Sequence, residues 1–240
     1  MRVPSRLMLG LVCVLTSFAL WPATPAAQFS GPLAGVTPGP WRSLFDGTSL
    51  AAFRGYRMTT VPPGWTIADG TLTKNEKTID LVSWDLFSDF DLVVEWKIGA
   101  AGNAGIFYRG NEIYDHIYMT APEYQLLDDL GAEDNRTASH LAGSAYDLIA
   151  GPGGHTRPVG YWNEARIIAK GNYVEHWLNG VKMLDYEIGS PNWQAAFAAS
   201  KFSAPTWPKD FASLRRGYIA FQGDHDGALA FRNIRVRELK

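Results

Sequence analysis

The 240-residue sequence has a single cysteine, Cys13, which lies in an apolar N-terminal stretch. The rest of the chain therefore forms no internal disulfide, and a chain of this length buries enough apolar surface to fold without one. An excess of positive charge is also lacking, since 22 Lys and Arg stand against 24 Asp and Glu. Because the basic residues form no stripe, we expect no nucleic-acid partner.

Several catalytic motifs are missing as well. The chain has no nucleophile elbow, P-loop, GxGxxG, HExxH or EF-hand pattern. The ExDxE strand pattern of retaining glycosidases is also absent, which argues against the ordinary two-carboxylate mechanism. Metal ligands can be gathered from separate loops, so a divalent metal ion stays open as a cofactor without assigned ligands.

Residues 1–27 have the features of a secretory signal peptide. Arg2 and Arg6 precede an apolar core over residues 7–20, and small residues follow. The apolar run is too short and too N-terminal for a transmembrane span, so we expect a periplasmic or secreted protein with no stable membrane span after removal of the signal. The Pro/Gly-rich residues 28–40 predict a flexible lead-in, and residues 41–240 predict a single domain.

From residue 41 on, short strand patterns alternate with Gly, Asn, Asp and Pro turns. Hairpin turns are predicted at Asp69-Gly70, Gly171-Asn172 and Asn179-Gly180. A short helix is predicted over residues 193–201. Many strands within one domain of this size predict an all-β fold, a jelly-roll β-sandwich of two antiparallel sheets.

The stretch "PEYQLLDD" combines polar and apolar residues with the period of a strand. Glu123 and Gln125 share one face, and Tyr124 and Leu126 share the other. We expect Tyr124 and Leu126 to face the core. Glu123 and Gln125 would then line the outer face of a sheet, where curvature creates a groove.

Arginine and histidine side chains are further candidates for chemistry. Arg109 ends the strand pattern "GIFYRG", where it either forms a structural ion pair with Glu123 or donates two hydrogen bonds to a substrate oxygen. His225 lies in "GDHDG", which suits either an imidazole oriented by a carboxylate or a plain turn. His176 lies on an apolar face, which favours packing over catalysis, and His140 lies in a loop-like segment.

The nine tryptophans permit two interpretations. Aromatic rings stack on the C–H faces of sugars, and they also fill sandwich cores. A carbohydrate site therefore fits the composition. The sequence is compatible with an enzyme and also with a non-catalytic, lectin-like carbohydrate-binding module on the same face.

An ordered set of segments from about residue 41 to 240 carries a family resemblance: "SLFDGTSLAAFRG", "WTIADGTL", "FDLVVEWKIGAAGNAGIFYRG", "PEYQLLDD", "GYWNEARIIAKGNYVEHWLNGVK", "GSPNWQ", "SKF" and "GYIAFQGDHDGALAFRNIRVREL". In these segments the chain resembles the 3-keto-disaccharide hydrolase family. The resemblance implies a concanavalin-like jelly roll and action on glycosides oxidised to a ketone at C3. Two departures are Ala104, where the family usually has Ser, and Gly223-Asp224, which separate Gln222 from His225.

The chemistry that this resemblance implies starts from the ketone. A C3 ketone acidifies the C2 proton, a base removes that proton, and the enolate expels the C1 leaving group by β-elimination. Water then adds back to complete a net hydrolysis. The reaction needs a base near C2, donors for the enolate oxygen and an acid near the glycosidic oxygen.

Roles for individual residues follow as expectations. Glu123 or His225 is the base, and Arg109 and Gln125 hold the ketone or enolate oxygen. Asp128 or Asp129 supplies the acid or binds a metal, and a divalent ion could replace Arg109 at the enolate. Contacts to a small carbohydrate substrate, the one partner that we predict, are assigned to Asn103, Asp129, His140, Trp162 and Trp177. The polar residues between 103 and 129 favour the enzyme over the binding module.

Overall fold

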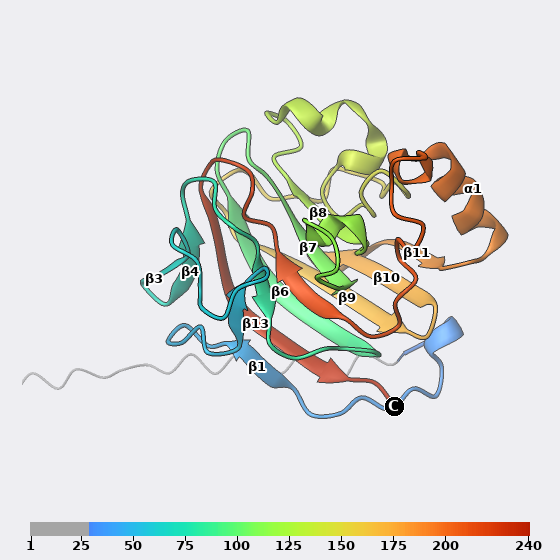
Figure 1. The fold of residues 1–240 in the computed structure, drawn as a ribbon, viewed down its shortest axis with the longest axis horizontal. Helices are drawn as coiled ribbons and strands as arrows, with labels where there is room; N and C mark the ends of the chain where they lie inside the picture. The colour runs from blue at the N-terminus through green and yellow to red at the C-terminus, as the bar shows by residue number, and fades with distance from the viewer. Residues whose placement is uncertain (1–28) are drawn as a thin grey trace, which may run out of the picture.

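A computed structural model describes residues 29–240 as two antiparallel sheets packed face to face, with a single α-helix to one side (Figure 1). The all-β sandwich predicted from the turn and strand pattern is confirmed. The predicted signal peptide lies outside the described residues. Within residues 29–240, no helix is both long and apolar enough to cross a membrane.

The larger sheet contains eight strands in the order β11-β10-β9-β6-β13-β4-β3, with β1 paired to β13 off this path. Its strands are β1 (Arg42–Phe45), β3 (Thr66–Ala68), β4 (Thr71–Lys74), β6 (Phe90–Ile98), β9 (Asn163–Lys170), β10 (Tyr173–Leu178), β11 (Val181–Glu187) and β13 (Leu229–Glu238). The last strand of the chain, β13, lies in the interior of this sheet, between β6 and β4.

The smaller sheet contains five strands in the order β2-β5-β12-β7-β8. Its strands are β2 (Phe53–Gly55), β5 (Leu81–Ser83), β7 (Asn103–Gly110), β8 (Glu123–Leu127) and β12 (Tyr218–Phe221). The stretch that holds Glu123 and Gln125 is thus the edge strand β8, paired in antiparallel register with β7.

The helices are short and follow local capping signals. The α-helix α1 spans Pro191–Ala199 instead of the predicted residues 193–201, because the Ser190 side chain accepts from the Trp193 backbone N–H and Pro191 takes the first turn. Five 3₁₀ turns complete the described chain: η1 (Gly31–Leu33), η2 (Ile117–Met119), η3 (Glu133–Arg136), η4 (Ala138–His140) and η5 (Lys201–Ser203).

The three predicted hairpins are present. Asp69-Gly70 joins β3 to β4 with φ of 49° and 70°, and Asn179-Gly180 joins β10 to β11 with φ of 51° and 82°. Left-handed backbone at both central residues is what a two-residue turn of this twist requires, and Asn, Asp and Gly adopt it most easily. Gly171-Asn172 connects β9 to β10.

The core lies between the two sheets, as the strand alternation predicts. Leu92, Val94 and Trp96 of β6 face Tyr124 and Leu126 of β8 across one continuous apolar cluster. These side chains are all fully buried. The outer face of β8 is therefore left to Glu123 and Gln125.

Residues 29–40 of the predicted lead-in make contacts with the body of the domain. Leu33 is buried and packs in a small cluster with Ile168 and Leu239, and Thr37 exchanges backbone hydrogen bonds with Lys240. The Pro/Gly content predicts a flexible segment. Apolar contacts that the composition does not reveal fix it to the body of the domain.

Candidate active site

A pocket of about 220 Å³ lies over the outer face of the smaller sheet at its β7–β8 edge. Its floor is made by Asn103 of β7 and by Glu123 and Gln125 of β8. The predicted alternation places the last two there, since Tyr124 between them points into the core.

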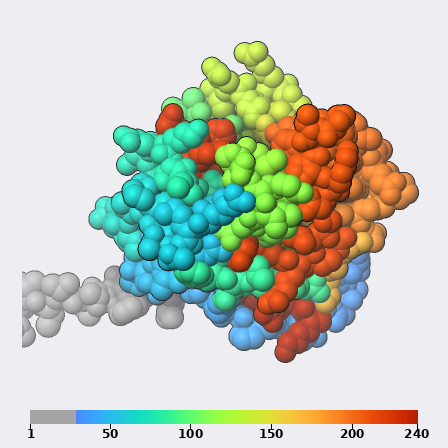
Figure 2. Space-filling model, in the orientation of Figure 1, coloured from blue at the N-terminus to red at the C-terminus, as the bar shows by residue number. Residues whose placement is uncertain are grey.

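Loops from distant parts of the chain form the walls of this pocket. Figure 2 views the face on which η2 (green), the chain after α1 (orange) and the η3–η4 region (yellow-green) lie near one another. The walls comprise Tyr118, Asp134, Tyr146, Lys201, Phe202, Gln222, Asp224 and His225. The pocket thus gathers the carboxyl groups of Glu123, Asp134 and Asp224, together with Lys201 and the imidazole of His225.

Glu123 has the most perturbed carboxyl group of the pocket. Burial raises its pKa to about 8, the nearby Lys201 ammonium opposes this rise, and the charges of Asp224, Asp80 and Asp134 add to it. A carboxylate with this pKa is a much stronger base than an exposed one. Its position on a pocket floor makes it available to a ligand.

The Glu123 carboxylate lies directly over Gly105 of β7. A Cβ atom at position 105 would come within 1.9 Å of Glu123 Oε1. The backbone of Gly105 does not adopt a left-handed conformation, so the missing side chain, not backbone freedom, explains the glycine. Gly105 provides the space in which the carboxylate rests.

A chain of hydrogen bonds connects the floor to one wall. Gln125 Nε2 donates to Asn103 Oδ1 at 3.0 Å, and Asn103 Nδ2 donates to Asp134 Oδ2 at 3.4 Å. Tyr146 Oη also donates to Asp134 Oδ2, at 3.0 Å. His140 lies behind this wall, with Nδ1 2.7 Å from Asp134 Oδ1 and its ring stacked on that of Tyr146.

Several acceptor oxygens of the pocket receive no hydrogen bond from any residue between 29 and 240. Gln125 is fully buried and Gln222 is nearly so, yet Oε1 of each makes no hydrogen bond; the same holds for Asp224 Oδ1. A buried acceptor without a donor is costly, by about 1–3 kcal/mol. A ligand that brings hydroxyl groups would satisfy these oxygens.

Comparison of the sequence with known protein families identifies the family of this chain. A model of the 3-keto-alpha-glucoside-1,2-lyase-like domain matches residues 40–237. The chain belongs to this family. A relative in Bacteroides thetaiotaomicron, named 3-keto-disaccharide hydrolase, is 35% identical, and the match covers 82% of this chain and 78% of the relative.

Solved structures agree with this membership in the 3-keto-alpha-glucoside-1,2-lyase-like family. Two proteins of Parabacteroides distasonis, both described as candidate glycosyl hydrolases, are 29% and 25% identical with TM-scores of 0.76 and 0.69. Each comparison covers 83% of this chain, and they cover 94% and 100% of the respective Parabacteroides distasonis chains. A Bacillus subtilis protein with a galectin-like fold, 11% identical over 85% of this chain and 98% of its own, has a TM-score of 0.57 and supports the jelly-roll fold alone.

The structure brings part of the predicted site of this family member together. Asn103, Glu123, Gln125 and His225 line one pocket. His140 does not line it but holds Asp134, which does. The other predicted residues lie elsewhere, each for a physical reason.

Arg109 is not a substrate-binding residue, and that prediction is wrong. Its guanidinium is buried, with Nε and Nη2 donating to Ser88 O and Nη1 donating to Gly171 O, and Nη2 lies 3.2 Å from the Asp89 carboxylate. Strand alternation fails here because β7 has a bulge. Gly110 pairs with Tyr218 and Tyr108 with Ile219, so Arg109 is left unpaired with a φ of 55° and turns away from the pocket face.

We expect Arg109→Met to lower the free energy of unfolding by about 2 kcal/mol, since two backbone carbonyls lose their donors. Asp89 keeps its ion pair with Lys170, which limits the loss. Urea unfolding measures this change, and kcat of the folded variant should remain within about threefold of wild type. A large loss of kcat in a variant of unchanged stability would return Arg109 to the active site.

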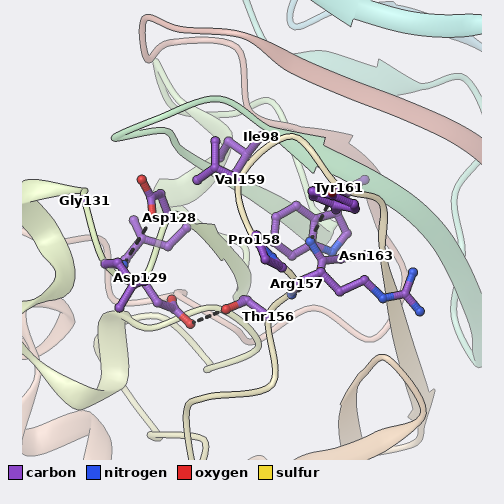
Figure 3. Close-up of a pocket in the computed structure, with 13 residues that line it drawn as sticks. Ile98, Asp128, Asp129, Gly131, Thr156, Arg157, Pro158, Val159, Tyr161 and Asn163 are labelled. Atoms are coloured by element: carbon purple, nitrogen blue, oxygen red, sulfur yellow. Dashed lines mark hydrogen bonds between the residues drawn. The ribbon is translucent and has the colours of Figure 1, made fainter.

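Asp128 and Asp129 line a second hollow of about 480 Å³ (Figure 3). Glu123 is not among the residues that line it. Strand β8 ends at Leu127, so the chain turns before it reaches them. Asp128 accepts from the backbone N–H groups of Ala101 and Leu130. Asp129 accepts from the Ala142 backbone and from Thr156 Oγ1. Both carboxylates hold loops, and the expectation of an acid or a substrate contact at the Glu123 pocket is wrong.

Trp162 and Trp177 lie on the outer face of the larger sheet, on the far side of the sandwich from the pocket. The Arg232 guanidinium lies 4.2 Å and the Lys97 ammonium 4.9 Å from the centre of the Trp162 ring. Trp177 donates to Glu175 and packs beside the Leu33 cluster. The prediction that they stack on the substrate in the Glu123 pocket is therefore wrong.

His176 is a core residue, as its apolar face indicates. It is fully buried, with Nε2 2.8 Å from Tyr108 Oη and Nδ1 3.2 Å from Gly143 O. Burial lowers the pKa of this imidazole to about 3, so it stays neutral in the native protein.

Sequence reasoning missed Lys201, Asp134, Tyr146, Gln222 and Asp224 as pocket residues. "SKF" is one of the segments that carry the family resemblance, but nothing in its pattern indicates that Lys201 reaches the pocket. Its ammonium lies 4.2 Å from the centre of the Tyr146 ring. Concerning the metal that the sequence left open, no group of three or more His, Cys, Asp or Glu suited to a metal ion occurs among residues 29–240.

Proposed function

We propose that this protein is a carbohydrate-active enzyme that cleaves 3-keto-glycosides, 3-keto-disaccharides included, by proton abstraction at C2. The observation that carries the proposal is the Glu123 carboxyl group, buried on a pocket floor with its pKa raised to about 8. Membership in the lyase-like family and the name of the Bacteroides thetaiotaomicron relative support the same chemistry.

The first step needs a base for a weakly acidic carbon. The Glu123 carboxylate takes the C2 proton, and the electrons of the C2–H bond form the C2=C3 double bond of an enolate. A general base works best when its pKa is near the operating pH, which the raised pKa of Glu123 provides.

The developing enolate oxygen requires positive charge, which Arg109 cannot supply from its buried position. Lys201 lines the pocket, and its ammonium is close enough to Glu123 to lower the pKa of that carboxyl group. We assign the stabilisation of the enolate oxygen to Lys201. Asn103, Gln125 and Gln222 complete the polar surroundings of the sugar ring.

The second step breaks the glycosidic bond. As the C3 carbonyl re-forms, the electrons of the C2=C3 bond form a C1=C2 double bond. The C1–O bond breaks, and the departing oxygen keeps its electron pair. His225, whose side chain is 43% exposed beside Asp224, is the group at the pocket from which the departing oxygen takes a proton. Addition of water, oxygen to C1 and hydrogen to C2, then gives net hydrolysis.

The size of the pocket limits what it holds. A volume of about 220 Å³ lies below the range of 300–1,000 Å³ that is usual for drug-sized ligands. It suits a single sugar ring with the leaving group outside. The N-terminal signal pattern leads us to propose that the enzyme works in the periplasm or outside the cell.

The proposal is tested with a 3-keto-glucoside and its unoxidised parent, offered to the mature protein at equal concentration. We expect product release from the ketone alone, because the parent has no acidic C2 proton. Equal cleavage of both compounds would overturn the mechanism. Binding of both without any turnover would mean that the chain is a carbohydrate-binding module.

A further inference from the structure

The direction of each hydrogen bond between Asp134 and the pocket floor is fixed by chemistry. An ionised carboxylate has no proton and only accepts. Because Asn103 faces Asp134 Oδ2, it must turn its NH2 group toward that oxygen. Tyr146 Oη and His140 Nδ1 hold the same carboxylate, so Asp134 has little freedom to rotate.

The orientation of Asn103 then determines that of Gln125. With its NH2 group on Asp134, Asn103 presents Oδ1 to Gln125, and an amide oxygen only accepts. Gln125 therefore has to donate from Nε2, as the 3.0 Å contact requires. Its Oε1 is therefore left buried, without a donor among residues 29–240, on a side chain that lines the pocket.

We propose that Gln125 Oε1 is an acceptor that recognises one hydroxyl group of the sugar ring, so that the site selects glycosides bearing that hydroxyl. The inference rests on the proposed function for the identity of the ring. It reverses the expected role of Gln125, since an oxygen with lone pairs repels a ketone or enolate oxygen. A site built to bond a hydroxyl discriminates against analogues that lack it, because its own acceptor then stays unpaired.

Asp134 and Asn103 are positioning residues in this arrangement, because they act through Gln125. Gln222 adds a second buried oxygen without a donor, and nothing in the described chain fixes the orientation of its amide. The assignment is therefore made for Gln125. The floor as a whole favours a ligand rich in hydroxyl donors.

The test uses binding rather than turnover, so that it does not depend on the proposed reaction. Methyl glucoside and its 2-, 4- and 6-deoxy analogues are titrated into the wild-type protein by calorimetry or NMR. We expect one analogue to bind about tenfold to thirtyfold more weakly than the parent, as the loss of a hydrogen bond to a buried acceptor requires. Gln125→Met should bind that analogue and the parent alike.

Asp134→Asn tests the relay without touching Gln125. An amide at position 134 can donate or accept, so Asn103 and Gln125 are no longer forced into one orientation. We expect the variant to lose most of the discrimination between parent and deoxy analogue. Asp115→Asn, at a side chain that is 88% exposed outside the pocket, should keep it.

The outcomes separate this inference from the proposed function. Equal binding of the parent and all deoxy analogues, full discrimination in Asp134→Asn or Gln125→Met, or no measurable binding of the parent would each overturn the inference. Turnover of 3-keto-glycosides without discrimination between the parent and the deoxy analogues would support the proposed function and overturn the role of Gln125. Discrimination without turnover would support the role of Gln125 and overturn the proposed function.

Discussion

Glu123→Gln should lower kcat on a 3-keto-glycoside roughly a thousandfold, the scale of a lost general base. The amide is nearly isosteric with the carboxyl group but cannot take up the C2 proton. Because the shape is kept, we expect the melting temperature at neutral pH to change by only a few degrees. Steady-state kinetics and thermal unfolding on the same preparation give both results. A large loss of stability with little change in kcat would make Glu123 an architectural residue.

The pKa of Glu123 also predicts the pH dependence of the rate. If the carboxylate is the base, kcat/KM of wild type rises with pH and levels off above about 8, where the group is ionised. A rate that decreases as the pH rises through this range would instead make Glu123 the acid.

The same group makes a contribution to stability with a definite sign. The native pKa of about 8 is above the ordinary glutamate value of 4.5, so native Glu123 holds its proton more tightly than the unfolded chain does. Its contribution is complete below about 4.5 and is lost as the pH rises through about 8. Relative to wild type, Glu123→Gln should therefore gain stability between pH 5 and pH 9. Asp80, whose pKa is raised to about 7, is present in both proteins, but its charge acts on Glu123 in wild type alone.

Gly105→Ala should lower kcat about a hundredfold, because it displaces the base without altering its chemistry. A Cβ atom at position 105 would lie 1.9 Å from Glu123 Oε1, so the carboxylate must leave its resting place. The backbone of Gly105 is one that alanine can adopt. The variant should accordingly fold, with a smaller change in stability than in rate.

A double variant isolates the cause of this loss. In a Glu123→Gln background, Gly105→Ala should add little further loss, since the base is already gone. Gly39→Ala is the matched control. A Cβ atom at position 39 would also make a close contact, 3.3 Å from the Glu238 carbonyl oxygen, but Gly39 does not line the pocket. Equal additional losses in the two backgrounds would show that Gly105 acts on something other than Glu123.

Local sequence patterns correctly predicted the strand faces and the hairpin turns, which depend on residues close together in the sequence. The period of two in β8 placed Tyr124 and Leu126 in the core and Glu123 and Gln125 on the outer face. Asn-Gly and Asp-Gly pairs placed hairpin turns at 179–180 and 69–70. In each case the determining property is the conformation of the residue itself or of its immediate neighbours.

The same reasoning failed where the local pattern is interrupted. The bulge at Arg109 reverses the face of the side chain, and the pairing of β7 with β12 creates it, some hundred residues along the chain. Asp128 and Asp129 follow the last residue of β8, so the strand period no longer applies to them. A resemblance in sequence order could not reveal either event.

By itself the sequence determined the sandwich, its hairpins, and the presence of Glu123 and Gln125 on an outer face, because backbone preference and hydrophobic alternation act over a few residues. Tertiary structure alone decided that Lys201, Asp134 and Tyr146 close over them. It also decided which atom of Gln125 meets a ligand, since three side chains from separate segments impose that orientation through space.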